Sequence, residues 1–254
     1  MIHPSIAVLE HNLVNYRRTW RATVFTSFLM PVLFLLAMGK SVGSYVDARA
    51  SLGLPYVDYI APGLLAATAL QVAVAESTWP VYSALQWTRV YYAMLAAPLR
   101  VVDLLIGHLG YAVVRVTATG AGFLIVMAAF GTLHSPRAIG ALAAAMLLGL
   151  ACAAPAFAFA ASVSTDGMFP VLLRFAVLPM TLFAGVFFPV ESLPTIIRPL
   201  AYASPLWHGV ELARAATLGA DPAWAAPAHV GYLLLWVAGG LLLARRAFTR
   251  KLLV

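Results

Sequence analysis

Glu76 and Arg115 are the residues of this sequence whose setting most directly suggests chemistry, because each lies within an otherwise apolar stretch. A charge in hydrocarbon is costly, so such side chains usually face the interior of a helix bundle and pair. Glu76 lies near the end of one stretch, and Arg115 lies about two turns into the next, which begins on the same side. The two can therefore reach each other. They form either a gate or substrate contact, or a structural ion pair or snorkelling side chains.

Other signatures of chemistry are missing from the sequence. Residues 38–41, Met-Gly-Lys-Ser, resemble the end of a phosphate-binding loop, but that motif requires glycine where Phe34 stands. The six histidines are scattered without metal-ligand spacing, and Cys152 is the single cysteine of the sequence. We therefore expect no catalytic residue, no metal site and no cofactor bound by this chain, and any ATP must bind to another chain.

The composition indicates the class of protein. Of the 254 residues, 63% are hydrophobic and 10% are charged, and the mean hydropathy is +0.90. A soluble domain carries about 25% charged residues, and one globular core cannot bury so large an apolar surplus. An integral membrane protein is expected. The net charge of +7 then marks cytoplasmic loops rather than a nucleic-acid surface.

Six stretches are long and apolar enough to be membrane spans. We expect one all-α transmembrane domain over residues 1–254, with spans at 22–38, 58–79, 108–130, 138–162, 171–188 and 227–244. Pro31 lies inside the first predicted span, and membrane helices tolerate such a proline. Pro170 and Pro189 flank the fifth predicted span, where they limit the helix. Because the number of spans is even, both termini lie on the same side.

Arginine and lysine residues place the termini in the cytoplasm. With the termini inside, ten basic residues lie on the cytoplasmic side and only five on the outer side, as the positive-inside rule requires. The five outer residues are Lys40, Arg49, Arg137, Arg198 and Arg214. The clearest part of this signal is the C-terminal group of Arg245, Arg246, Arg250 and Lys251.

The first 21 residues precede the first span and carry a helical pattern. Apolar side chains recur at spacings of 3 and 4, namely Ile6, Leu9, Leu13, Tyr16 and Trp20. This predicts an amphipathic helix in the membrane interface that leads into the first span. The alternative is a disordered polar tail.

Two connections between spans are unusually long. Residues 80–107 are rich in aromatic side chains and include a plausible short helix over 81–92, so a mere tether is not expected. Residues 189–226 form an apolar, proline-broken outer segment, for which re-entrant or interfacial helices fit better than a water-exposed loop.

Several motifs resemble the ABC-2-type exporter permeases over nearly the whole chain. Residues 59–63, Tyr-Ile-Ala-Pro-Gly, resemble the family's Pro-Gly entry to the second span, and residues 76–107 resemble its cytoplasmic loop. Segments 183–194 and 204–214 are similar to the branch that contains the NodJ lipo-oligosaccharide exporter permeases and, more distantly, the daunorubicin-resistance permeases. Trp207 departs from the family pattern, in which a less bulky residue is expected.

The resemblance implies a complex of two permease chains, expected to be identical, with two copies of a separate ATPase subunit that binds ATP and Mg. The segment 81–98 would be the coupling helix on the ATPase, with aromatic anchors and a basic rim. Its contact residues would be Leu85, Gln86, Trp87, Arg89, Tyr91, Tyr92 and Arg100. A second contact would be made by Glu10, Arg17 and Arg18 of the N-terminal helix. The alternative role for the aromatic residues is an interfacial belt.

The resemblance also implies a substrate path between the two permease chains. The residues expected to line or gate it are Glu76, Arg115, Met180, Phe183, Phe187, Phe188 and Trp207. Met180, Phe183 and Phe187 fall at spacings of 3 and 4 on the fifth predicted span, which also suits plain helix packing.

We therefore expect the transmembrane subunit of an ATP-driven exporter in the bacterial cytoplasmic membrane, not an enzyme. Its substrate would be a glycolipid, a lipid-linked saccharide or a hydrophobic drug, as in multidrug resistance. The alternative is a self-sufficient secondary carrier or channel, and a structural membrane protein is a third option. No row of acidic residues runs through the spans, which disfavours an ion-driven carrier. The aromatic loop at 80–107 favours the exporter.

Overall fold

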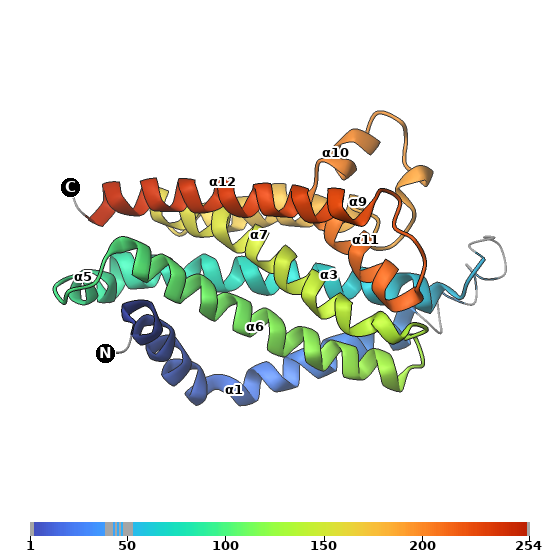
Figure 1. Cartoon of the computed structure of the whole chain (residues 1–254), viewed down its shortest axis with the longest axis horizontal. Coiled ribbons are helices and arrows are strands. Elements are labelled where there is room, and N and C mark those ends of the chain that lie inside the picture. The colour runs from blue at the N-terminus through green and yellow to red at the C-terminus, as the bar shows by residue number, and fades with distance from the viewer. Residues whose placement is uncertain (1–2, 39–42, 44, 46, 48–52, 253–254) are drawn as a thin grey trace.

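The computed structural model describes residues 3–38, 43, 45, 47 and 53–252 of the chain. These residues form helices and turns and no strand, which confirms the predicted all-α class. The long helices run along one axis and form an elongated bundle (Figure 1). The start of the first helix and the end of the last lie at the same end of this bundle (Figure 1). We call this the terminal end, and the opposite end the distal end.

The first helix, α1 (Pro4–Leu36), combines the predicted interfacial helix with most of the predicted first span. It begins at a proline, whose fixed φ and missing N–H suit a first helical turn. Figure 1 shows that α1 bends between its N-terminal part and the part that follows the bundle. Residues 39–41, which are most of the stretch that resembles a phosphate-binding loop, lie outside the described residues, as does Arg49.

The centre of the bundle is built from α3 (Tyr56–Ser77), α6 (Val101–Ala129), α7 (Gly140–Ser162) and α12 (Ala226–Leu252). α7 packs against α3, α6 and α12. Glycines allow this close approach: a Cβ at Gly149 would lie 2.9 Å from Val116 Cγ2, and one at Gly240 would lie 2.7 Å from Pro155 Cδ. Small residues at such contacts are typical of helices that pack within a membrane.

Between α3 and α6 the chain forms α4 (Trp79–Tyr82), the π-helix η2 (Ser83–Trp87) and α5 (Val90–Leu95). The short helix expected over 81–92 is therefore divided, because Arg89 adopts a left-handed φ of 53°. α6 begins seven residues before the expected position 108. The reason is a cap: the Arg100 main-chain N–H donates to Asp103 Oδ2 at 3.0 Å.

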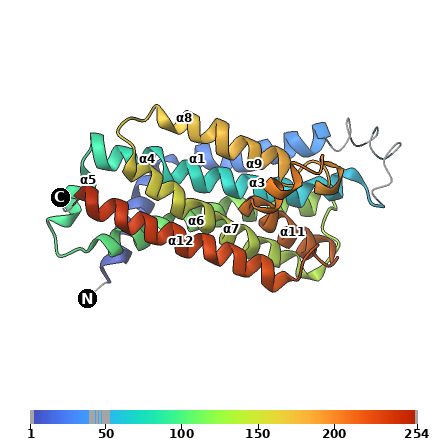
Figure 2. The ribbon, with the colours of Figure 1, turned by 90° about the horizontal axis from the view of Figure 1, so that it is seen from above.

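The helix η3 (Pro136–Ile139) precedes α7, and short helices follow it. They are α8 (Met168–Leu172), the π-helix η4 (Leu173–Val177), α9 (Leu178–Phe183), η5 (Val190–Ser192), α10 (Arg198–Tyr202) and α11 (Pro205–Leu218). Figure 2 shows α8 and α9 following one edge of the bundle. α9 ends five residues before the expected position 188, because the chain leaves the helix at Ala184 and Gly185 adopts a φ of 76°.

Four helices in the described part of the chain are long and apolar enough to cross a membrane: Tyr56–Trp87, Val101–Ala129, Pro136–Ser162 and Ala226–Leu252. The fifth predicted span corresponds to a shorter apolar helix, Met168–Phe183, of fewer than 18 residues, whereas a span needs about 20 residues. The first predicted span, 22–38, is helical throughout and reaches the edge of the described residues.

Candidate functional site

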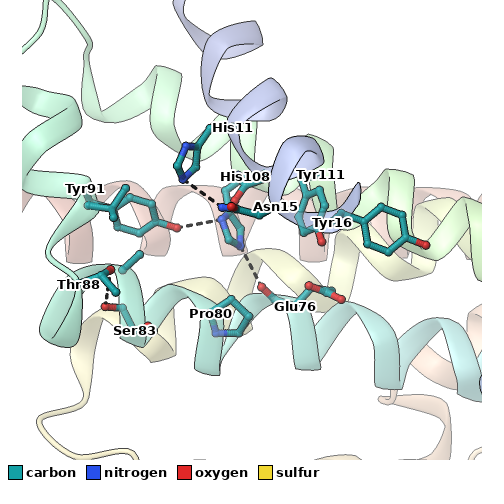
Figure 3. A pocket seen from close by; sticks show the side chains of 13 residues that line it. His11, Asn15, Tyr16, Glu76, Pro80, Ser83, Thr88, Tyr91, His108 and Tyr111 are labelled. Carbon is teal, nitrogen blue, oxygen red and sulfur yellow. Dashed lines mark hydrogen bonds between the residues drawn. The ribbon is translucent and has the colours of Figure 1, made fainter. Parts of the chain in front are cut away.

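A polar cavity of about 380 Å³ lies at the terminal end of the bundle (Figure 3). Residues of α1, the end of α3, the segment 79–95 and the first turns of α6 surround it. Its polar lining consists of His11, Asn12, Asn15, Tyr16, Glu76, Ser83, Thr88, Tyr91, His108 and Tyr111. The cavity thus joins the predicted interfacial helix, the predicted coupling segment and one of the two intramembrane charges.

Glu76 and Arg115 form an ion pair beside this cavity. Arg115 Nε donates to Glu76 Oε1 at 2.8 Å. The Arg115 side chain is 12% exposed and the Glu76 side chain is 16% exposed. The Arg115 guanidinium also lies 4.3 Å from the centre of the Tyr16 ring of α1. Because α6 begins at Val101, Arg115 lies about four turns into its helix and not the two turns expected. The pair therefore joins α3 to the middle of α6, with α1 packed on top.

His108 links three elements through both nitrogens of its buried ring, and the sequence analysis did not single it out. His108 Nε2 lies 2.9 Å from the main-chain oxygen of Glu76, and Nδ1 lies 2.9 Å from the Tyr91 hydroxyl. A carbonyl only accepts, so Nε2 carries the hydrogen and Nδ1 accepts from Tyr91. Burial raises the pKa of Tyr91, which keeps this donor protonated. Figure 3 shows the Tyr91 side chain pointing toward His108.

The predicted coupling residues divide into an inward and an outward group. Leu85 and Tyr91 are buried, and Gln86 is half-buried. The outward group consists of Trp87, Arg89, Tyr92 and Arg100, of which Trp87 is 61% exposed. The Trp87 ring packs edge-on against the Tyr82 ring, with 5.6 Å between the two ring centres. Trp87 is therefore held in place although it faces outward. The segment therefore presents aromatic and cationic side chains on a fixed support.

The predicted N-terminal contact residues Glu10, Arg17 and Arg18 are all exposed on α1. Val8, on the same helix, is instead buried against α6. A Cβ at Gly107 would lie 2.6 Å from Val8 Cβ, so the missing side chain of Gly107 allows α1 to pack closely there. This contact fixes α1 beside the cavity and leaves its charged residues outside.

The structure does not bring the predicted path residues at the distal end onto one helical face. Met180 and Phe183 belong to α9, whereas Phe187 and Phe188 follow its end, so the expected three-and-four spacing does not continue to Phe187. Trp207 is buried, and its ring packs against Tyr202, Trp224, His208 and His229. Met180 lines a separate apolar cavity of about 210 Å³ between α3, α7, α9 and α12.

Arg214 holds the chain that follows α9, a role that the sequence analysis missed. Its Nη2 donates to the main-chain oxygen of Gly185 at 2.8 Å, and its Nη1 donates to Glu211 Oε1 at 2.9 Å. The Tyr59 hydroxyl donates to the same oxygen of Gly185 at 3.2 Å. The available signal was the spacing of Glu211 and Arg214, three residues apart, which on a helix places an acid beside a base.

The fold and this site define a multi-pass membrane protein with apolar helices and a supported polar segment at one end. The chain belongs to the ABC-2 type transporter family, whose sequence profile matches residues 5–218. Members of this family are membrane subunits of transporters. The chain is therefore a transporter permease, which confirms the family resemblance inferred from the motifs.

Several relatives resemble the chain over nearly its whole length. Nodulation protein J of Rhizobium leguminosarum bv. viciae is 27% identical over 248 residues, which cover 98% of this chain and 95% of the relative. Nodulation protein J of Sinorhizobium fredii (strain NBRC 101917 / NGR234) is 28% identical over 248 residues, which cover 98% and 94%. The corresponding protein of Rhizobium meliloti (strain 1021) is 24% identical over the same shares.

Proposed function

We propose that this permease is the transmembrane subunit of an ATP-driven exporter in the bacterial cytoplasmic membrane. Two copies of the chain would form the permease, and two copies of a separate ATPase would bind ATP and Mg. The observation that carries the proposal is the outward group, Trp87, Arg89, Tyr92 and Arg100, on a buried support. Rigid aromatic and arginine side chains of this kind are typical anchors of protein interfaces.

The proposed topology has six spans with both termini in the cytoplasm. The four long apolar helices would be joined by the apolar part of α1 as the first span and by Met168–Phe183 as the fifth. The terminal end would then face the cytoplasm, and the proline-broken chain from 184 to 218 would form the outer, re-entrant segment. The basic residues near the end of α12 support this orientation.

Coupling would use the network around His108. Movement of the docked segment would reach α6 through the Tyr91–His108 hydrogen bond, and α3 through the bond from His108 to the Glu76 oxygen. Glu10, Arg17 and Arg18 would supply the second contact to the ATPase. Hydrolysis in the partner would thus move the two permease chains relative to each other as packed bodies.

The proposed substrate is amphipathic: a glycolipid, a lipid-linked saccharide or a hydrophobic drug. The resemblance to exporter permeases supports this class, as does the apolar cavity that Met180 lines. Phe183, Phe187 and Phe188 would lie along the path, and Trp207 would support its outer end from within the aromatic cluster around it. Glu76 and Arg115 would act at the inner end of the path.

Mild-detergent purification of the tagged chain from its native membranes tests the proposal. The co-purifying chains are identified by mass spectrometry, and the preparation is assayed for vanadate-sensitive ATP hydrolysis. We expect a stoichiometric soluble partner that carries a phosphate-binding loop. Repeated isolation of this chain without any ATPase would instead support a self-sufficient carrier or channel.

A further inference from the structure

A basic groove of about 700 Å³ runs between the ends of α7 and α12 at the terminal end. Its wall is apolar along most of its length, and its cations come from α12 alone. The lining residues are Pro155, Ala158, Phe159, Ala161, Ser162, Leu243, Arg246, Ala247, Arg250 and Lys251. We call this the α7–α12 groove.

The helical register gathers these cations on one side. Positions 243, 246, 247, 250 and 251 differ by 3, 4, 7 and 8 from the first, so they share one stripe of α12. Arg245, although adjacent in sequence, does not line the groove. The contact of Gly240 with Pro155 holds the two helices together one to two turns earlier, at the point from which the groove opens.

The groove carries a concentrated positive charge that nothing in the described chain neutralises. Arg246, Arg250 and Lys251 contribute three cations, no carboxylate lines the groove, and no salt bridge joins these residues to an acid in the described part of the chain. Arg246 and Arg250 stand four residues apart on the helix, a spacing at which like charges repel. An anion bound between them would relieve this repulsion.

We propose that the α7–α12 groove binds the phosphate headgroup of an anionic phospholipid from the leaflet at the terminal end. Guanidinium groups bind phosphate oxygens through paired, charge-assisted hydrogen bonds. The groove lies at the end of the apolar helix α12, where headgroups and acyl chains meet, and basic pockets between helices at this depth suit such lipids. Leu243, Phe159 and Pro155 offer an apolar wall for the first part of an acyl chain.

A lipid fits the groove better than an acidic surface of the ATPase partner. The apolar wall continues from the cations toward the membrane interior, which a protein surface in the cytoplasm cannot follow. The assignment of this leaflet to the cytoplasm rests on the topology in the proposed function. The binding itself does not, because it concerns the permease chain alone.

The test measures lipid binding to the purified full-length chain in nanodiscs made of phosphatidylcholine with a small fraction of fluorescent phosphatidylglycerol. A basic group that contacts the headgroup of an anionic lipid strengthens binding about fivefold, and among the basic residues of α12 only Arg246, Arg250 and Lys251 line the groove. We therefore expect Arg246→Gln to weaken binding about fivefold and the triple change Arg246→Gln/Arg250→Gln/Lys251→Gln to weaken it about 100-fold. Arg245→Gln is the matched control and should leave binding unchanged.

A second variant separates a shaped site from a general attraction of charge. Ala247→Phe retains every cation but fills the half-buried floor of the groove, so we expect it to weaken binding as well. Equal effects of Arg245→Gln and Arg246→Gln, or an unchanged affinity in Ala247→Phe, would overturn the proposal. Displacement of the lipid by millimolar inorganic phosphate would identify a site for a free anion instead.

Two further outcomes bear on the assignment. Unchanged lipid binding in the triple variant together with loss of the co-purifying ATPase would identify the groove as a protein contact and overturn the proposal. Lipid binding that follows the groove variants, in a chain that purifies without any ATPase, would support the proposal while contradicting the exporter function.

Discussion

The Tyr91 hydroxyl donates a hydrogen bond of 2.9 Å to His108 Nδ1, and this bond joins the predicted coupling segment to the interior of the bundle. Both side chains are buried, with Tyr91 3% and His108 2% exposed. The other ring nitrogen of His108 donates to the Glu76 main-chain oxygen near the end of α3. A segment with outward-facing anchors is thereby fixed to two long helices rather than suspended as a free loop.

Tyr91→Phe should lower stability, because it removes the hydroxyl donor and leaves His108 Nδ1 buried without its partner. An unsatisfied buried polar group costs about 1–3 kcal/mol. The measurement is denaturant unfolding of the purified chain in detergent. Tyr92→Phe is the matched control: the Tyr92 hydroxyl donates to the Lys251 oxygen at 3.3 Å from an exposed position, so its loss should have little effect. Equal destabilisation by both changes would contradict the assigned network.

The ion pair between Glu76 and Arg115 predicts that substitutions of these two residues have non-additive effects on the free energy of unfolding. Glu76→Gln leaves the largely buried Arg115 without its counter-charge, and we expect a loss of about 1–3 kcal/mol. Arg115→Met in the same chain removes the cation that has lost its carboxylate and should restore part of that loss. A double-mutant cycle from unfolding measurements gives the interaction energy. Additive effects would show that the two side chains do not stabilise each other. Glu10→Gln, which changes a glutamate at an exposed site, is the control.

The sequence predicted the long apolar helices well and the ends of several elements poorly. α3 begins two residues before the expected position 58, and α7 ends at the expected Ser162, because hydropathy over about 20 residues is a strong signal. The start of α6 at Val101 depended on a local cap at Asp103, which hydropathy does not detect. Likewise, the end of α9 depended on the backbone of Gly185.

The site was predictable only where a residue type was unusual for its surroundings. Glu76 and Arg115 stood out as charges in apolar stretches, and the structure joins them. His108 did not stand out, because its importance comes from the Tyr91 hydroxyl and the Glu76 carbonyl, which approach it only after folding. Arg214 was counted only as an outer charge, although it holds the Gly185 oxygen.

Gly63 should be among the least replaceable small residues of α3. A Cβ at this position would lie 2.8 Å from the Val186 main-chain oxygen, so Gly63→Ala must displace the chain that follows α9. We expect a loss of about 1–3 kcal/mol in unfolding measurements, as is usual for overpacking. Gly231→Ala is the matched control, because nothing lies within 4 Å of its Cβ position on α12. Alanine there should be neutral or stabilise by up to about 1 kcal/mol through helix propensity.

The central claim is that Trp87 and Arg89 of the segment between α3 and α6 dock an ATPase. The most direct test compares the wild-type chain with Trp87→Ala/Arg89→Ala, purified from native membranes, by the amount of co-purifying ATPase per permease. Ile196→Ala/Arg137→Ala, with exposed residues at the distal end, is the matched control. We predict that the first variant reaches the membrane at normal abundance but loses at least about nine-tenths of the ATPase, as expected from removal of an interface anchor. Retention of the ATPase and of transport in that variant would contradict the account.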